Sequence, residues 1–185
     1  MVLTKTPICN FGEKPHSFEL KGVNNKLYKF EECVGEKGTL IMFICNHCPY
    51  VKAVIKDIVS DSNSLENLGV KTIAIMSNDT KNYPDDSFDK MKEFSSVNKF
   101  NFPYLIDETQ EIAKKYDAVC TPDFFGYNKN LELQYRGRIR ELKDLKPIEG
   151  GESDLLKAMK MITKTGQGPK EQVSSMGCNI KWFKN

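Results

Sequence analysis

Apolar and polar residues follow two different periods along this chain, and the period indicates which element each segment forms. Short apolar runs at residues 38–44 and 70–76 predict strands that are buried on both faces. An amphipathic helix is predicted directly after the first run, because apolar residues recur there at helical spacing. These residues are Val51, Val54, Ile55, Ile58 and Val59.

The other segments continue an alternation of strands and helices. Residues 17–20 and 26–28 predict a β-hairpin, residues 87–97 a helix, 102–106 an extended segment, 123–127 and 131–136 a strand pair, and 152–162 a last helix. Asp107 with Gln110 fits a capping box for a short helix through Tyr116. This order predicts an α/β fold with a central mixed β-sheet flanked by helices.

The domain organisation follows from a change in composition near residue 162. Residues 1–162 are predicted to form one domain, and residues 163–185 a glycine-containing C-terminal tail. The tail carries the single tryptophan, Trp182, within an aromatic cluster that a disordered tail would not favour. We therefore expect the tail to dock on the domain.

Charge and cysteine content narrow the function classes. The 185 residues include 27 Lys and Arg against 25 Asp and Glu, a net charge of +2, which gives no overall footprint for nucleic acid or an anionic membrane. The N-terminus lacks the apolar run of a signal peptide, so a cytoplasmic location is expected. In a reducing compartment the 6 cysteines favour catalysis, redox sensing or metal binding over structural disulfides.

One cysteine pair has a spacing with chemical meaning, Cys45-Asn46-His47-Cys48, and it lies at a predicted strand-to-helix junction. The N–H groups at a helix N-terminus favour a thiolate. Cys45 is expected to be the exposed nucleophile with a lowered pKa, and Cys48 the resolving thiol inside the first turn. Asn46 or Cys45 is the candidate N-cap, and Pro49 is tolerated in the first turn.

His47 modulates this pair, because an imidazole beside a thiolate stabilises the dithiol and so raises the reduction potential. The competing interpretation is a zinc site that uses Cys45, His47, Cys48 and a distant cysteine. Such a site usually needs a second clustered pair of ligands, and the sequence has none. We therefore expect no metal and no cofactor.

Thr121-Pro122 precedes the predicted strand at residues 123–127. A strand, CxxC and helix followed by Thr-Pro before a β-hairpin resembles the thioredoxin superfamily. The resemblance implies a thioredoxin fold, here with an N-terminal β-hairpin extension and an inserted helix. It also implies that Pro122 is cis, that Thr121 lies beside Cys45, and that the neighbouring backbone binds substrate.

Further motifs resemble the branch that joins the AhpC/TSA proteins with the TlpA- and ResA-like oxidoreductases. They lie at residues 12–20, 102–107, 116–125 and 136–138. A group of bacterial peroxiredoxin-like proteins shares three blocks with this chain, at residues 45–51, 120–123 and 177–182. Two features depart from these patterns: residues 40–44 hold no buried carboxylate, and the proline and hydroxyl that precede a peroxiredoxin cysteine are missing. Cys48-Pro49 does match the Cys-Pro of peroxiredoxins.

Two more cysteines bear on the site. Cys120 is either a thiol beside the substrate-binding face or a small buried apolar side chain. Cys178 lies in the tail and resembles the C-terminal resolving cysteine of some peroxiredoxins. It is expected either to exchange with Cys45, within the chain or across a homodimer, or to be incidental to docking of the tail.

The sequence therefore predicts a thiol–disulfide oxidoreductase that uses a Cys45–Cys48 couple. Its expected partners are protein disulfides or a thioredoxin-type reductant, with no nucleic acid and no membrane. A thiol-dependent peroxidase is the first alternative. A non-catalytic redox-sensing or zinc-binding module with the same fold is the second.

Overall fold

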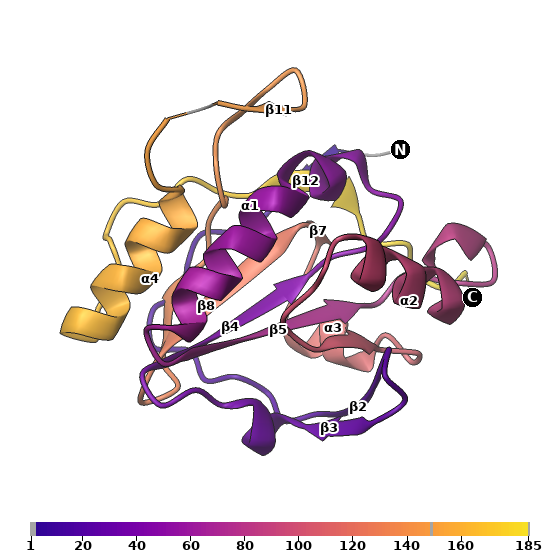
Figure 1. The fold of residues 1–185 in the computed structure, drawn as a ribbon, viewed down its shortest axis with the longest axis horizontal. Helices are drawn as coiled ribbons and strands as arrows, with labels where there is room; N and C mark the ends of the chain where they lie inside the picture. The colour runs from indigo at the N-terminus through magenta and orange to yellow at the C-terminus, as the bar shows by residue number, and fades with distance from the viewer. Residues whose placement is uncertain (1–2, 149, 185) are drawn as a thin grey trace.

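A computed structural model describes residues 3–148 and 150–184, and a seven-stranded sheet forms its centre (Figure 1). The strand order is β3-β2-β6-β5-β4-β8-β9. The strands are β2 (Glu19–Gly22), β3 (Leu27–Lys29), β4 (Gly38–Phe43), β5 (Val70–Met76), β6 (Tyr104–Ile106), β8 (Asp123–Asn128) and β9 (Leu133–Tyr135). β4 pairs in parallel with β5, and β5 with β6, while the other pairs are antiparallel. The predicted central mixed sheet is confirmed.

Helices cover both faces of this sheet. They are α1 (Pro49–Glu66), α2 (Phe88–Val97), α3 (Glu111–Lys115) and α4 (Asp154–Thr165), with 3-10 turns η1 (Phe30–Cys33) and η2 (Pro84–Asp86). Figure 1 shows α1 in front of β4, with α4 beside it. The last helix continues to Thr165, three residues beyond the expected end at residue 162, and Gly166 caps it in the left-handed conformation with φ 78°.

The expected capping box before α3 is wrong. Gln110 is itself the N-cap, with a left-handed φ of 62°, and its side chain donates to the carbonyls of Ser77 and Lys181. Asp107 does bind the helix, but its Oδ2 accepts from the backbone N–H of Ala113 at 2.9 Å. The Gln110 side chain therefore binds the backbone of the C-terminal segment and does not cap the helix. Sequence spacing does not reveal this long-range contact.

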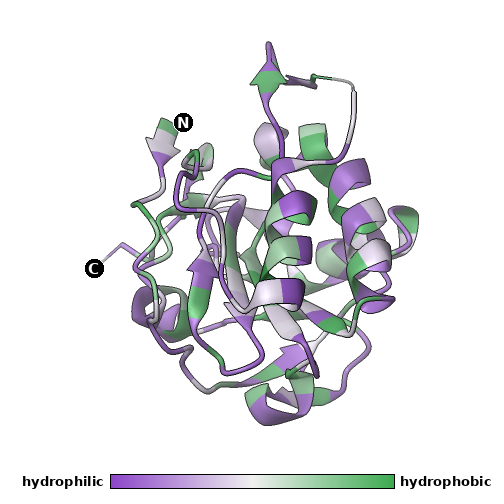
Figure 2. Ribbon diagram, turned by 90° about the vertical axis from the view of Figure 1, so that its left-hand side faces the viewer, coloured by the Kyte–Doolittle hydropathy of each residue, from purple (hydrophilic) through white to green (hydrophobic). Residues whose placement is uncertain are grey.

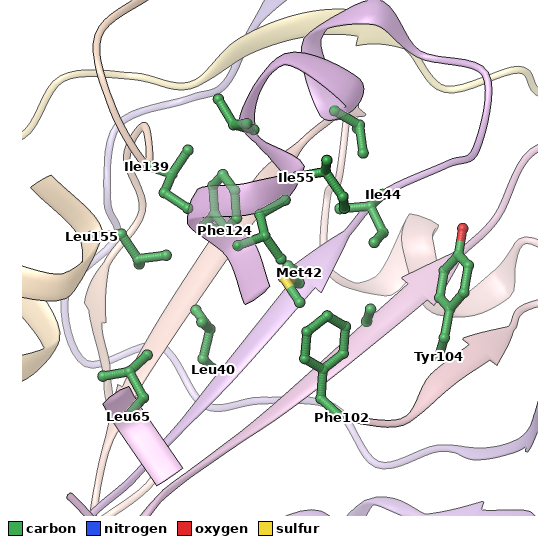
Figure 3. Close-up of a cluster of buried hydrophobic side chains, with 14 of the residues drawn as sticks. Leu40, Met42, Ile44, Ile55, Leu65, Phe102, Tyr104, Phe124, Ile139 and Leu155 are labelled. Atoms are coloured by element: carbon green, nitrogen blue, oxygen red, sulfur yellow. The ribbon is translucent and has the colours of Figure 1, made fainter. Parts of the chain in front are cut away.

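Successive residues of β4 alternate between two apolar layers, as residues of a doubly covered strand must. Leu40, Met42 and Ile44 pack toward α1, with Ile55 from the helix and Phe124 from β8 against them (Figure 3). Ile41 and Phe43 point to the opposite layer, which includes residues of α3 such as Ile112 and Ala113. Hydrophilic and hydrophobic residues alternate along the helices that cover the sheet (Figure 2).

The tail joins a second, three-stranded sheet of order β1-β12-β7. Its strands are β1 (Leu3–Lys5), β7 (Cys120–Thr121) and β12 (Met176–Asn179), and both pairings of β12 are antiparallel. Gly177 allows the close approach, because a Cβ there would lie 1.9 Å from the carbonyl oxygen of Thr121. The short strands β10 (Leu142–Lys143) and β11 (Lys146–Pro147) pair with each other. None of the helices within the described ranges is long and apolar enough to cross a membrane.

Candidate active site

The candidate site lies where β4 ends and α1 begins, next to the start of β8. Cys48 is the N-cap of α1 and Pro49 follows at its first position. The expectation that Asn46 or Cys45 caps the helix is therefore wrong, as is the placement of Cys48 inside the first turn. The reason is Pro49, which is best tolerated at the first helical position and so fixes the residue before it as the cap.

Both sulfur atoms of the pair are enclosed. Cys45 is 1% exposed and Cys48 is 0% exposed. The Cys45 Sγ lies 3.4 Å from the Thr121 Oγ1, and the Cys48 Sγ donates to the Thr121 carbonyl at 3.1 Å. The Cys48 Sγ also lies 3.1 Å from the Cys178 Sγ. The expectation of an exposed Cys45 is wrong, because the tail and the Thr121 loop close over the junction.

The two thiols differ in acidity, and in the opposite sense to the expectation. The pKa of Cys48 is lowered to about 5, chiefly by the interaction with Cys45. Burial acts to raise this pKa, and the contact with Cys178 lowers it further. The hydrogen bond to Cys48, burial and the charge of Asp86 raise the pKa of Cys45 well above its usual value. Cys48 is therefore the more acidic thiol of the pair, although its thiol form also donates to the Thr121 carbonyl, and it lies at the helix N-terminus, where the backbone N–H groups favour an anion.

A buried carboxylate that the sequence analysis missed holds the CxxC loop. Oδ1 of Asp86, the last residue of η2, accepts from the backbone N–H groups of Asn46 at 2.8 Å and His47 at 3.2 Å. Oδ2 lies 2.6 Å from the His47 Nδ1 and accepts from the Asn78 Nδ2 at 2.7 Å. The acidic segment after β5 could have indicated this carboxylate. Because β4 and β5 are neighbouring parallel strands, the segments that follow them begin at the same edge of the sheet.

Charge and hydrogen bonding shift both members of this pair. The hydrogen bond to Asp86 raises the pKa of His47, although partial burial opposes it. For Asp86, burial acts to raise the pKa, but the hydrogen bonds from His47 and Asn78 and the His47 charge lower it overall. The His47 ring also stacks on Tyr83, with 5.9 Å between ring centroids and 8° between planes. His47 is thus held as a hydrogen-bonded imidazole with its Nδ1 3.9 Å from the Cys45 Sγ.

Asn46 has a positioning role in the same loop. Its Oδ1 accepts from the buried Tyr104 hydroxyl at 2.9 Å, and its Nδ2 donates to the Asp85 carbonyl at 3.1 Å. The Tyr104 hydroxyl lies near the Ile44 end of β4 in Figure 3. These contacts anchor the residue between the two cysteines to β6 and η2.

The Thr121–Pro122 peptide bond is cis, and Thr121 lies beside Cys45, as the resemblance implies. The β7 backbone before Pro122 pairs with this chain's own β12, with Cys178 opposite Thr121 and Asn179 opposite Cys120. Cys120 is fully buried with its Sγ 3.8 Å from the Pro122 carbonyl, and burial raises its pKa far above its usual value. These features fit the small buried apolar side chain among the two interpretations of Cys120.

The residues also test the zinc interpretation. One ligand atom each of Cys45, His47 and Asp86 lies within 4.8 Å of the other two. However, the Asp86 carboxylate already accepts four hydrogen bonds, and its Oδ2 lies 2.6 Å from the His47 Nδ1. Neighbouring ligands of a tetrahedral zinc ion lie about 3.3 Å apart. The group fits a hydrogen-bonded pair beside a thiol better than a ligand set.

The chain matches the AhpC/TSA family over residues 11–142. No curated protein sequence matches it significantly. An uncharacterized conserved protein from Geobacillus kaustophilus is similar over 100% of this chain and 98% of its own, with 36% identity and a TM-score of 0.94.

Two distant structures share the fold. A secreted Mycobacterium tuberculosis disulfide oxidoreductase homologous to E. coli DsbE has 16% identity and a TM-score of 0.56, over 68% of this chain and 87% of that one. Peroxidoxin BcpB from Mycobacterium tuberculosis has 12% identity and a TM-score of 0.56, over 69% and 83%. The mixed sheet with its flanking helices is therefore a thioredoxin fold. With most of its length matched, the chain belongs to the AhpC/TSA family.

Proposed function

We propose that this protein is a thiol–disulfide oxidoreductase in which Cys45 and Cys48 alternate between dithiol and disulfide. One observation carries the proposal: both sulfurs lie beside Thr121 and the cis Pro122 at the N-terminus of α1, where Cys48 is the N-cap, and the interaction with Cys45 lowers the pKa of Cys48. A thiolate stabilised in this way favours the reduced form, so the disulfide is oxidising. The couple accordingly donates its disulfide readily to substrate thiols.

The environment of the two sulfurs assigns their roles. Cys45 lies next to the partly exposed His47, whereas Cys48 is enclosed by Thr121 and Cys178. A substrate thiolate attacks the Cys45 sulfur, the Cys45–Cys48 bond breaks, and Cys48 leaves as a thiolate. A low pKa makes Cys48 a good leaving group. A second substrate thiolate then attacks the substrate sulfur of the mixed disulfide. This step releases Cys45 as a thiolate, which takes up a proton.

The reverse direction uses the same residues. The Cys45 thiol passes its proton to the Cys48 thiolate and attacks a substrate disulfide, which forms the mixed disulfide and releases one substrate thiolate. Cys48 gives that proton to the released thiolate, attacks the Cys45 sulfur of the mixed disulfide, and so forms the Cys45–Cys48 bond and releases the second substrate thiolate. The Thr121 side chain and the backbone around Pro122 position the substrate beside Cys45, once the tail segment at β12 has moved. A thioredoxin-type protein is the proposed exchange partner, in the cytoplasm.

Single cysteine variants test this assignment. With a disulfide-linked test peptide and excess dithiothreitol, Cys45→Ser should lose reduction above the uncatalysed rate. With the same peptide and no added reductant, pre-reduced Cys48→Ser should accumulate a mixed disulfide with the peptide, visible by mass spectrometry. Cys33→Ser removes a buried thiol remote from the site and serves as the matched control. Catalysed turnover by Cys45→Ser would contradict the roles.

A thiol-dependent peroxidase is the second candidate, and the burial of both sulfurs favours it, because a small oxidant reaches an enclosed thiolate more readily than a protein does. The Cys48 thiolate would attack a peroxide oxygen, breaking the O–O bond to give sulfenic acid and, after protonation, an alcohol or water. The Cys45 thiol would condense with the sulfenic acid, releasing water and forming the disulfide. Peroxide consumption in the presence of thioredoxin and its reductase tests this activity, and its absence would eliminate the second candidate.

A further inference from the structure

We propose that Cys178 is a third redox-active residue, which takes over from Cys45 the disulfide bond to Cys48 and so ties the C-terminal tail to the active site. This inference rests on the proposed Cys45–Cys48 couple and adds a second disulfide that shares Cys48. The observation that points to it is the 3.1 Å distance between the Cys48 and Cys178 sulfur atoms. Exchange between these sulfurs needs only a small approach to the covalent distance of about 2.05 Å.

The fold holds Cys178 in this place because β12 lies between β1 and β7 and contacts the chain on each side of it. Its neighbour Gly177 lies against the Thr121 carbonyl, where no larger residue fits. Ser175 donates from Oγ to the Pro122 carbonyl at 2.7 Å and accepts at its own carbonyl from the N–H of Thr6. The sulfur is therefore presented by a paired strand whose register fixes Cys178 opposite Thr121.

The exchange conserves electrons and protons within the chain. The Cys178 thiolate attacks the Cys48 sulfur of the Cys45–Cys48 disulfide. A Cys48–Cys178 bond forms, the Cys45–Cys48 bond breaks, and the electron pair leaves on the Cys45 sulfur. The proton lost by Cys178 ends on Cys45, so no external oxidant or reductant is consumed.

The environment of each thiol suits its part in this step. In the reduced protein, burial and the neighbouring Cys48 raise the pKa of Cys178 to about 12, while the Lys181 ammonium acts to lower it. Once Cys48 is in a disulfide it carries no charge, so its share of that rise disappears and the thiolate becomes more accessible. The contribution of Cys48 to the raised pKa of Cys45 disappears in the same way, but burial and the charge of Asp86 still raise that pKa, so Cys45 keeps the transferred proton.

The exchange has a consequence for access to the site. Strand β12 pairs with β7, directly before the cis Pro122, and lies against the enclosed Cys48 through Cys178. A Cys48–Cys178 bond would fix this strand covalently while Cys45 returns to the thiol form. The protein would then hold its oxidising equivalent in a buried disulfide that bulky thiols reach slowly.

Disulfide mapping of the full chain tests the inference. The protein is equilibrated with a mixture of reduced and oxidised glutathione, quenched with acid, alkylated, and the monomer is digested without reduction. We expect both Cys45–Cys48 and Cys48–Cys178 peptides, the second at no less than about a tenth of the first, since two similar disulfides exchange with an equilibrium constant near unity. Cys45→Ser should form only Cys48–Cys178, and Cys178→Ser only Cys45–Cys48.

The outcomes separate the two proposals. Absence of a Cys48–Cys178 peptide from the natural chain, with Cys45–Cys48 still formed, overturns the inference and leaves the proposed function intact. Absence of Cys45–Cys48 from Cys178→Ser overturns the proposed function instead. Mapping of the natural chain decides the inference even if a variant fails to fold, and Cys33→Ser should reproduce the natural pattern.

Discussion

The His47 Nδ1 lies 2.6 Å from the Oδ2 of Asp86, a fully buried carboxylate that comes from a different loop. This pair orients His47, which lies between Cys45 and Cys48 in the CxxC loop. The same carboxylate binds the N–H groups of Asn46 and His47, so it also fixes the backbone of the CxxC loop. Asp86 therefore controls both the charge near Cys45 and the geometry of the loop.

Replacing Asp86 should change stability and acidity together. Asp86→Asn removes the negative charge and puts an amide nitrogen where Oδ2 accepts from the His47 Nδ1 and the Asn78 Nδ2, and we expect the free energy of unfolding to fall by about 1–3 kcal/mol. The pKa values of His47 and Cys45 should both fall, because Asp86 raises each of them. Denaturant unfolding and NMR titration of the His47 ring provide the measurements. Asp85→Asn, at the exposed neighbouring position, is the control, and an unchanged His47 pKa would contradict the assignment.

The same pair predicts how stability depends on pH. The His47 pKa is raised in the folded protein, so its stabilisation is fully present below the unfolded value of about 6.5 and is lost as the pH rises through the folded pKa. The Asp86 pKa is lowered, so its stabilisation is present above about 3.9 and is lost as the pH falls through the folded pKa. The free energy of unfolding that is lost on His47→Gln should therefore be greatest between about pH 3.9 and about pH 6.5.

A double-mutant cycle checks this pH dependence. The free energy of unfolding is measured for the natural chain and His47→Gln across the pH range, and again for both in an Asp86→Asn background. The cost of His47→Gln should decline with rising pH only where Asp86 is present. A cost that is flat with pH in the natural background would refute the prediction.

The closure of the tail over the site depends on Gly177. A Cβ at this position would meet the Thr121 carbonyl, and Gly177→Ala should weaken docking of β12 by about 1–3 kcal/mol, as overpacking does. Buried thiols react only when the cover opens, so alkylation of Cys45 and Cys48 by iodoacetamide should accelerate about tenfold for each 1.4 kcal/mol. Met176→Ala changes an exposed side chain of the same strand and should leave the rate unchanged. Equal rates in the two variants would contradict the role of the tail as a cover.

A buried ion pair supports the loop behind the cis proline. The Arg136 Nη2 lies 3.0 Å from the Oδ2 of Asp123, the residue after Pro122, and the side chains are 5% and 0% exposed. Breaking such a pair leaves a buried charge alone, so Arg136→Met should cost about 3–5 kcal/mol in denaturant unfolding. Adding Asp123→Leu should restore part of that loss. Arg138→Met removes a more exposed pair with Asp154 and should cost less than about 1 kcal/mol. Similar losses for both arginines would show that burial does not set the cost.

Much of the fold could be read from local patterns. The apolar runs that became β4 and β5 and the helical spacing in α1 fixed the elements around the site, because burial on two faces or on one face leaves a direct trace in sequence. The Cys45-Asn46-His47-Cys48 spacing located the candidate site at their junction. The helix boundary was missed, since the cap depends on where Pro49 is best tolerated.

The chemistry of the site came from contacts that no local pattern contains. Asp86 reaches His47 from 39 residues away, and Cys178 reaches Cys48 across 130 residues. The parallel pairing of β4 with β5 and the pairing of β12 with β7 bring these segments together. Burial and hydrogen bonding then set which thiol is the more acidic. The sequence determined the residue types and the elements that hold them, whereas the thiolate position and the partner of Cys178 depend on distances and desolvation that exist only in the folded chain.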